Sequence, residues 1–255
     1  MTTINSIHDP APNTQELVGL TGLRGVAALM VLAFHLFAFA EPREIALNIA
    51  GDRYELHWLI TGGFMGVHIF FVLSGFLLTL PFARHALGQR AGVNLSRYVS
   101  RRLWRVFPAY WTQLIILVVA AYLMTQRIPS FETLLAHIAM FPIAWKLEYA
   151  DAINNVYWTL PTELSFYFLL PIIVFVVGRM AATGLRKWII AGGVLLLAAI
   201  IYRYLAFQMV HDSPIPERVW LIGQLPGYID LFAYGMLAAF AVIKLEGQPT
   251  RFYAR

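Results

Sequence analysis

The sequence predicts an all-α protein, a bundle of transmembrane helices, and three observations support this prediction. Of the 255 residues, 59% are hydrophobic and 13% are charged, whereas a soluble domain carries about 25% charged residues. The mean hydropathy is +0.65. The apolar residues form runs of roughly 20, the length that crosses a bilayer. One globular core cannot bury this much apolar surface, so we expect the bilayer to be the solvent of the chain.

Six apolar runs are long enough to span the membrane, and we expect each to form a helix. They are Leu17–Ala40, Phe64–Phe82, Val106–Thr125, Leu160–Gly178, Trp188–Gln208 and Val219–Ile243. A seventh run, Phe131–Trp145, is short and contains His137 and Pro142. It is either a re-entrant or interfacial helix or a short span, which gives six or seven spans.

The basic residues predict the orientation of these helices. The segment Ala83–Arg105 contains six arginines and no acidic residue, and the positive-inside rule places such a loop in the cytoplasm. The N-terminus is then cytoplasmic, and Glu41–Gly63, with its four acidic residues, is extracytoplasmic. If Phe131–Trp145 does not cross the membrane, the later basic clusters also lie on the cytoplasmic side. We therefore favour six full spans plus a re-entrant segment.

The predicted organisation is a single membrane domain over residues 17–245. Residues 1–16 are polar with two prolines and are expected to form a disordered cytoplasmic tail. Residues 246–255 are either a cytoplasmic tail or a truncation point.

Composition excludes several functional classes. The chain has no cysteine, which rules out disulfides, cysteine catalysis and thiolate metal sites. The net charge of +5 does not indicate nucleic acid, because the basic residues lie in loops beside apolar spans. The histidines show no metal-ligand spacing, so no metal site is expected.

Three motifs place polar groups in or beside the apolar runs, where such groups are functional-site candidates. The first is Gly22-Leu23-Arg24-Gly25 with His35 eleven residues after Arg24. Eleven residues are almost three helical turns, so Arg24 and His35 share a helix face about 16 Å apart. The second is Phe70–Leu77, which contains Ser74-Gly75. The third is Trp158–Glu163 together with the aromatic pair Phe166-Tyr167 that follows it.

An arginine block precedes Pro108 and the aromatic pair Tyr110-Trp111. Arg97, Arg101 and Arg105 recur every fourth residue and would form one face of a helix, with Arg102 beside it. Guanidinium groups bind phosphates with paired donors. The alternative is a positive-inside anchor for anionic lipid.

In this order, the three motifs and the arginine block resemble the acyltransferase-3 family of membrane acyltransferases, from about Leu17 to Ala241. The resemblance implies an O-acyltransferase that moves an acyl group from acyl-CoA to a hydroxyl of an extracytoplasmic acceptor. The acyl group is expected to be acetyl, and the acceptor a carbohydrate of a surface polysaccharide or glycolipid. It also implies a bacterial inner or plasma membrane, with membrane lipid as a partner and no tightly bound cofactor.

The resemblance assigns roles to named residues. His35 is the expected catalytic residue, as general base or as a transient acyl-histidine, and Arg24 and Glu163 assist it. Arg101, Arg102 and Arg105 are expected to bind the acyl-CoA donor. Substrate contacts are expected from Ser74, Asn155, Tyr157 and Trp158.

Each residue also has a structural alternative. His35 can be bonded to a neighbouring helix, and Arg24 can reach the lipid headgroups. Ser74-Gly75 permits close helix packing. Pro161 suits the first position of a helix, which would put Glu163 in the first turn. Asp230 is as well explained by an ion pair with Arg203 as by a site role.

Two positions depart from the family pattern. His68 stands where many relatives have aspartate, and Leu164 replaces the second of two adjacent glutamates. Members of the family usually have roughly ten spans, each of bilayer length, so the chain is expected to be a fragment or a natural short form. An inactive fragment and a transporter with buried charges on its substrate path are the alternative functions.

Overall fold

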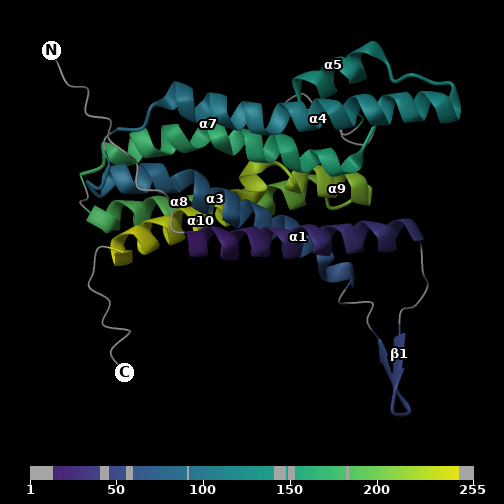
Figure 1. Cartoon of the computed structure of the whole chain (residues 1–255), viewed down its shortest axis with the longest axis horizontal. Helices are drawn as coiled ribbons and strands as arrows, with labels where there is room; N and C mark the ends of the chain where they lie inside the picture. Colours follow the sequence, from purple (N-terminus) through teal and green to yellow (C-terminus); the bar gives the residue numbers. More distant parts are fainter. Residues whose placement is uncertain are drawn as a thin grey trace. The chain divides into compact units, whose positions relative to one another are not determined.

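The structure is a computed structural model of the chain and describes residues 14–40, 46–55, 60–90, 92–140, 148, 153–181 and 184–246. Within these ranges it is helical apart from one two-stranded hairpin, which confirms the predicted all-α class (Figure 1). The chain divides into two compact units, Met1–Phe70 and Phe71–Arg255. The third helix, α3, crosses the boundary between them.

Six helices are long and apolar enough to cross a membrane, which confirms the six expected spans. They are α1 (Thr14–Ala40), α3 (Met65–Ala86), α4 (Leu95–Thr125), α7 (Thr159–Gly178), α8 (Gly184–Val210) and α10 (Leu225–Glu246). Large apolar side chains such as Leu29, Ile116 and Ile200 are exposed on these helices. Lipid would cover such side chains in a bilayer.

In the Met1–Phe70 unit, α1 packs closely on the short helix η1 (Gly62–Phe64) and the start of α3. A Cβ atom at Gly63 or Gly66 would collide with the backbone carbonyl of Met30 or Ala27. Two glycines spaced by one helical turn therefore let the two segments approach backbone to backbone.

The same unit contains a β-hairpin within the segment expected to be an extracytoplasmic loop. Strands β1 (Ala46–Ile49) and β2 (Asp52–Glu55) pair antiparallel around Ala50 and Gly51. These two residues have positive φ angles of 53° and 95°, as in the two-residue turns that match strand twist. The sequence analysis missed the hairpin because each strand has only four residues.

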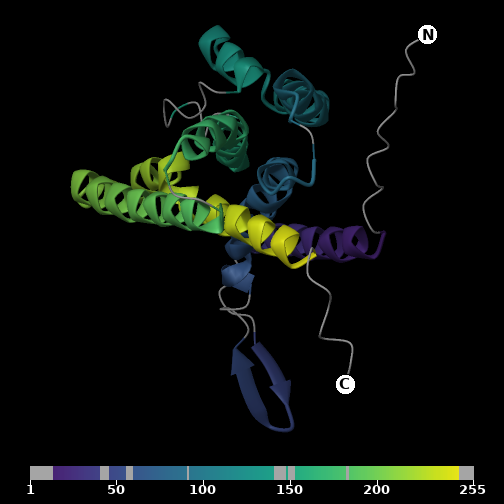
Figure 2. The ribbon, with the colours of Figure 1, turned by 90° about the vertical axis from the view of Figure 1, so that its left-hand side faces the viewer.

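In the Phe71–Arg255 unit, α7 lies between α4 and the pair α8 and α10 (Figure 2). Phe166 of α7 stacks on Phe232 of α10, with ring centroids 4.2 Å apart. Trp188 of α8 stacks on Phe240 of α10 at 4.1 Å. The first contact joins α7 to α10, and the second joins α8 to α10.

The close packing expected at Ser74-Gly75 is confirmed. A Cβ atom at Gly75 of α3 would collide with the backbone of Phe232, and one at Gly235 of α10 would collide with the backbone of Val72. The two helices therefore cross with their backbones in contact, and this crossing fixes the face of α3 that carries Ser74.

The predicted span Val219–Ile243 is wrong at its start. A short helix, α9 (Ile215–Ile222), ends before Gly223, and α10 begins at Leu225. Pro226 has no backbone N–H and cannot continue a helix from the preceding turn. The expected span is therefore broken into two helices.

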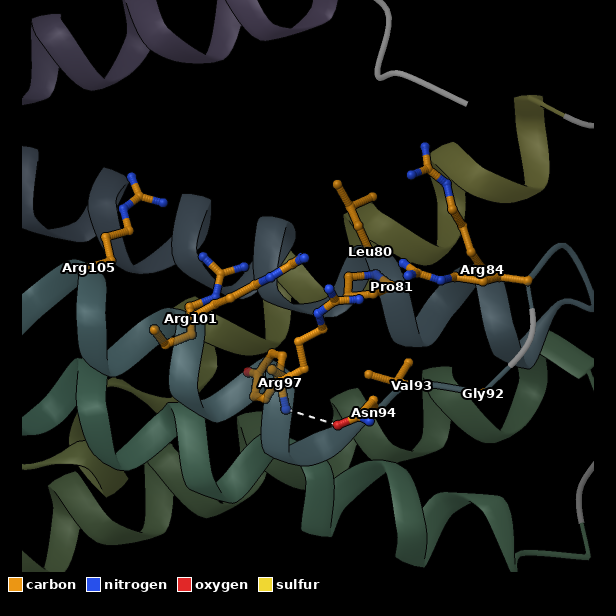
Figure 3. Close-up of a pocket in the computed structure, with 12 residues that line it drawn as sticks. Leu80, Pro81, Arg84, Gly92, Val93, Asn94, Arg97, Arg101 and Arg105 are labelled. Atoms are coloured by element: carbon orange, nitrogen blue, oxygen red, sulfur yellow. Dashed lines mark hydrogen bonds between the residues drawn. The ribbon is translucent and has the colours of Figure 1, made fainter. Parts of the chain in front are cut away.

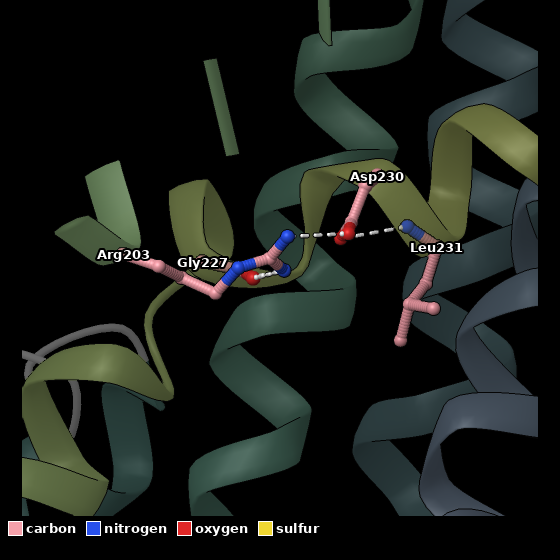
Figure 4. A network of polar contacts seen from close by, with 4 residues as sticks. All are labelled: Arg203, Gly227, Asp230 and Leu231. Atoms are coloured by element: carbon pink, nitrogen blue, oxygen red, sulfur yellow. Dashed lines mark hydrogen bonds and ion pairs between the residues drawn. The ribbon is translucent and has the colours of Figure 1, made fainter. Parts of the chain in front are cut away.

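The carbonyl groups at this break are bonded by side chains from α7 and α8. The Tyr202 hydroxyl donates to the Leu221 carbonyl at 2.8 Å, and the Thr162 hydroxyl donates to the Gly223 carbonyl at 3.3 Å. Arg203 donates to the Gly227 carbonyl and to the Asp230 carboxylate, each at 2.8 Å (Figure 4). Broken backbone at membrane depth requires such partners, so Asp230 takes the structural role of an ion-pair partner.

Two further predictions concern boundaries. Of the segment Phe131–Trp145, the described part is a nine-residue helix, α5 (Phe131–Ala139), which is too short to span because each residue rises about 1.5 Å. Residues 141–145 lie outside the described ranges. Helix α4 begins at Leu95, well before the expected Val106, because the Asn94 side chain caps it by accepting from the Arg97 backbone N–H at 2.9 Å. The arginine block is thus the first part of α4.

Candidate functional site

Glu163 of α7 is the centre of a polar network. Its Oε1 atom accepts a hydrogen bond of 2.6 Å from the Ser74 hydroxyl of α3 and another of 2.6 Å from the Tyr167 hydroxyl. Ser74 and Tyr167 are buried, so the carboxylate is held in one orientation. A carboxylate fixed by two hydroxyl donors keeps further acceptor capacity for a basic group or a substrate hydroxyl.

The expected helix start at this motif is wrong. Helix α7 begins at Thr159, and a 3-10 helix, η3 (Asn155–Trp158), precedes it. The Asn154 side chain caps this start by accepting from the Val156 backbone N–H at 3.1 Å. Glu163 therefore lies beyond the first turn of α7, and the effect of the helix dipole on its carboxylate is small there. The hydroxyls of Ser74 and Tyr167 stabilise the carboxylate instead.

A pocket of about 600 Å³ lies between the end of α3 and the start of α4. Its lining contains no acidic residue and six arginines: Arg84, Arg90, Arg97, Arg101, Arg102 and Arg105. Figure 3 shows the side chains of Arg84, Arg97, Arg101 and Arg105 extending to the same side. The expected shared face of the arginine block is therefore present, and two arginines from outside the block join it.

Neighbouring groups order part of this pocket. The Arg102 guanidinium lies 6.0 Å from the centre of the buried Tyr98 ring, within cation–π range. Arg84 forms an ion pair of 3.9 Å with Glu246 at the end of α10. The pocket as a whole stays strongly positive and suits a ligand with several anionic groups.

The arginine block and Glu163 lie on neighbouring helices. Helix α4, which carries Arg102 and Arg105, packs against α7, which carries Glu163 and Tyr167.

Aromatic rings surround the start of α7. Trp158 stacks on Tyr228 of α10 with centroids 5.6 Å apart, and Phe71 meets Trp158 edge to face at 6.3 Å. Tyr157 is buried and packs on Tyr110 of α4 at 5.0 Å. Of the predicted substrate contacts, Ser74 joins the Glu163 network, Trp158 and Tyr157 belong to this aromatic cluster, and Asn155 is described only as the first residue of η3.

The aromatic pair after Pro108 contacts α5. Tyr110 donates to the carbonyl of His137 at 2.7 Å, and Trp111 donates to that of Ile138 at 3.1 Å. These carbonyls belong to the last turn of α5, where they lack helical partners. The pair therefore anchors α5 onto α4.

Arg24 and His35 lie on α1, in the Met1–Phe70 unit. Both are half-buried, while their neighbours Leu23 and Leu36 are 42% and 60% exposed, as expected for two residues on one helix face. The His35 ring lies 5.2 Å from that of Phe34. His68, the departure from the family pattern, meets Phe64 edge to face at 5.6 Å in the same unit.

Several residues of these sites were not predicted. Tyr167 could have been found, because it lies one helical turn after Glu163. Arg84 and Arg90 lie outside the four-residue repeat, and only the fold brings them to the pocket. Among the described residues, no group of three histidine or acidic side chains has the arrangement of a metal site.

Comparison with curated proteins identifies O-acetyltransferases. The chain is 28% identical over 216 residues to "Putative peptidoglycan O-acetyltransferase YrhL" of Bacillus subtilis (strain 168), covering 79% of this chain and 30% of that protein. It is 27% identical over 169 residues to "O-acetyltransferase OatA" of Staphylococcus aureus (strain NCTC 8325 / PS 47), covering 62% of this chain and 24% of that protein. No solved structure matches the chain significantly. The chain thus spans less than a third of the length of these relatives.

A family described as an acyltransferase domain, the acyltransferase-3 family, matches residues 17–248. The match covers all six apolar helices except the first residues of α1. It also covers the arginine pocket and the Ser74–Glu163–Tyr167 network. The chain is an integral membrane protein and belongs to the acyltransferase-3 family of membrane acyltransferase domains.

Proposed function

We propose that this chain acts as a membrane-bound O-acyltransferase that moves an acetyl group from acetyl-CoA to a hydroxyl of an extracytoplasmic carbohydrate. Membership of the acyltransferase-3 family and the names of the two relatives support acyl transfer. The observation that carries the donor assignment is the pocket lined by six arginines.

Coenzyme A carries a diphosphate and a ribose phosphate, and guanidinium groups bind phosphates through paired, charge-assisted hydrogen bonds. A volume of about 600 Å³ lies in the range of small-molecule sites. Arg84 and Arg90 extend the donor site beyond Arg101, Arg102 and Arg105. A lipid anchor needs only exposed basic residues, whereas convergence of six arginines on one cavity favours a soluble polyanion.

The proposed location is a bacterial inner or plasma membrane with the N-terminus in the cytoplasm. The arginine-rich start of α4 would be cytoplasmic by the positive-inside rule, on the side where acyl-CoA occurs. The start of α7, with Tyr157 and Trp158, would then face the extracytoplasmic side, because α4 and α7 each cross once and the nine-residue α5 does not cross.

In the proposed reaction, His35 accepts the proton of the acceptor hydroxyl as its oxygen attacks the thioester carbonyl carbon. The new C–O bond forms, the C–S bond breaks, and the sulfur of coenzyme A leaves with the bonding electrons and takes up a proton. A transient acyl-histidine is the two-step alternative. Arg24 assists by electrostatic stabilisation, and Glu163, oriented by Ser74 and Tyr167, binds the acceptor hydroxyl.

The acceptor proposal follows the Bacillus subtilis relative, whose name specifies peptidoglycan. Aromatic faces bind sugar rings, and Trp158 and Tyr157 are the aromatic residues proposed for this contact near the start of α7. Asn155 remains a proposed substrate contact from the sequence. No tightly bound cofactor is needed for this chemistry.

The direct test is incubation of membranes that contain the protein with radiolabelled acetyl-CoA and purified peptidoglycan fragments or cell-surface polysaccharide, followed by mass spectrometry of the glycans. The proposal requires a mass increase of one acetyl group that depends on the protein. A glycan that stays unmodified with every acyl-CoA tested, together with protein-dependent solute movement across vesicles, would instead establish a transporter.

A further inference from the structure

His137 of α5 is a fully buried histidine that the proposed reaction does not use. Its Nδ1 atom lies 2.8 Å from the Thr133 carbonyl oxygen. A carbonyl only accepts hydrogen bonds, so Nδ1 carries a proton and Nε2 of the neutral ring keeps its lone pair. Burial lowers the pKa of His137, more than the bond to Thr133 raises it, so the ring is neutral at neutral pH.

The Nε2 atom of His137 is buried and has no hydrogen-bond partner among the residues that the structure describes. The same holds for the hydroxyl of Tyr157, whose side chain is 2% exposed. The two rings are neighbours, with centroids 6.0 Å apart. One is a hydrogen-bond acceptor and the other a donor, so their unmet requirements are complementary.

The surrounding contacts hold both rings in place. Tyr110 donates to the His137 carbonyl and packs against the Tyr157 ring, and Trp111 donates to the next carbonyl of α5. The bond between Nδ1 and the Thr133 carbonyl orients the His137 ring, and packing on Tyr110 orients the Tyr157 ring. Buried polar groups are almost always bonded, either to protein or to an ordered ligand.

We propose that His137 and Tyr157 form a buried binding site for one hydroxyl group, which donates to Nε2 of His137 and accepts from the Tyr157 hydroxyl. The hydroxyl comes either from an ordered water or from the acceptor sugar. The second source rests on the proposed function, whereas the first does not.

The first arm of the test is thermal unfolding of the full chain in detergent. Tyr157→Phe removes only the hydroxyl. If an ordered water occupies the site, this change should lower the unfolding temperature by about 2–4 °C, the shift expected for one lost hydrogen bond, whereas a site filled only by the sugar should show the loss only when the sugar is added. The positive control is Tyr110→Phe, which deletes a hydroxyl that already has a partner. If the Tyr157 hydroxyl binds nothing, its removal should leave the protein unchanged or more stable, since an unmet polar group is deleted.

His137 is tested by a pair of variants. His137→Gln keeps an acceptor, and His137→Phe keeps a ring without one, so the glutamine variant should retain more of the stability. If His137→Phe fails to fold, the Tyr157→Phe variant still tests the proposed hydroxyl-binding site.

The second arm measures acetyl transfer from labelled acetyl-CoA to a soluble N-acetylglucosamine tetramer. If the sugar supplies the hydroxyl, Tyr157→Phe raises the KM for the tetramer roughly 3–10-fold and leaves the KM for acetyl-CoA unchanged. If water supplies it, stability falls and both KM values stay the same. If Tyr157→Phe causes no loss of stability and no rise in either KM, the proposed binding site is refuted. Absence of transfer by the wild-type protein would refute the proposed function, and the unfolding arm would still test the site.

Discussion

Ser74 of α3 donates a 2.6 Å hydrogen bond to Glu163 of α7, across 89 residues of sequence. Two motifs that the sequence presents separately therefore meet at one carboxylate oxygen. The crossing of α3 and α10 at Gly75 and Gly235 fixes Ser74, and the Thr162 hydroxyl ties the neighbouring turn of α7 to Gly223. The site is thus built from three helices.

Removal of the Ser74 hydroxyl should slow the reaction. Hydrogen bonds to charged groups contribute about 1.5–3 kcal/mol, so Ser74→Ala should reduce kcat roughly 10- to 100-fold if Glu163 acts in the reaction. Tyr167→Phe should have a similar effect because it removes the other donor to the same oxygen. The matched control is Ser165→Ala, which leaves both bonds to Glu163 in place. Full activity in the Ser74→Ala protein would show that the bond between Ser74 and Glu163 serves helix packing and does not contribute to the reaction.

The arginine pocket predicts a selective effect on the donor. Arg101→Ala and Arg105→Ala should each raise the KM for acetyl-CoA about tenfold or more, since each removes a charge-assisted contact to phosphate. The KM for the glycan should stay unchanged. Arg186→Ala removes the same charge from an exposed position of α8 outside the pocket and is the control. If all three substitutions change the KM for acetyl-CoA equally, the arginine block does not bind the donor selectively, and the lipid-anchor interpretation is favoured.

The crossing of α3 and α10 predicts a difference between two glycines. Gly75→Ala places a Cβ atom against the Phe232 backbone, which cannot move as a side-chain end can. Overpacking of this kind costs about 1–3 kcal/mol, so the unfolding temperature in detergent should fall. Gly193→Ala on α8 places its Cβ in open space, and there alanine should be neutral or stabilising. A stable Gly75→Ala protein would refute the backbone contact.

His137 predicts a pH dependence of stability. Burial lowers its pKa from the ordinary value of 6.5, so below about pH 6.5 the unfolded chain binds a proton here that the folded chain does not. Stability from this residue is therefore complete above pH 6.5 and is lost as the pH falls toward the lowered pKa. His137→Gln removes this proton-linked loss, so its unfolding temperature relative to wild type should rise as the pH falls below 6.5. A constant difference between pH 7.5 and 5.5 would contradict a lowered pKa.

Hydropathy and periodicity predicted the helical class and the six spans, because bilayer length is a local property of the sequence. The arginine repeat likewise predicted one helix face, since residues four apart on a helix are neighbours. The break before α10 was missed. Gly223 and Pro226 lie inside an apolar run, and only the side chains of Thr162, Tyr202 and Arg203 make the broken backbone tolerable.

The partners of site residues were harder to predict than the residues themselves. Nothing local pairs Ser74 with Glu163, or Arg84 and Arg90 with the block on α4, because these contacts depend on how helices pack. His137 has no motif around it. Its interest arises from its burial and from two atoms, its own Nε2 and the Tyr157 hydroxyl, that have no hydrogen-bond partner among the described residues.

The most direct test of the central claim, acyl transfer at His35, is the rate of acetyl transfer from labelled acetyl-CoA to glycan by His35→Ala. General-base catalysis contributes about 10²–10⁴ in rate, so the rate should fall by that factor while expression, membrane insertion and the KM for acetyl-CoA match the wild type. His211→Ala, at an exposed histidine paired with Asp212, should retain full activity. A well-expressed His35→Ala protein that transfers acetyl groups at the wild-type rate would contradict the mechanism.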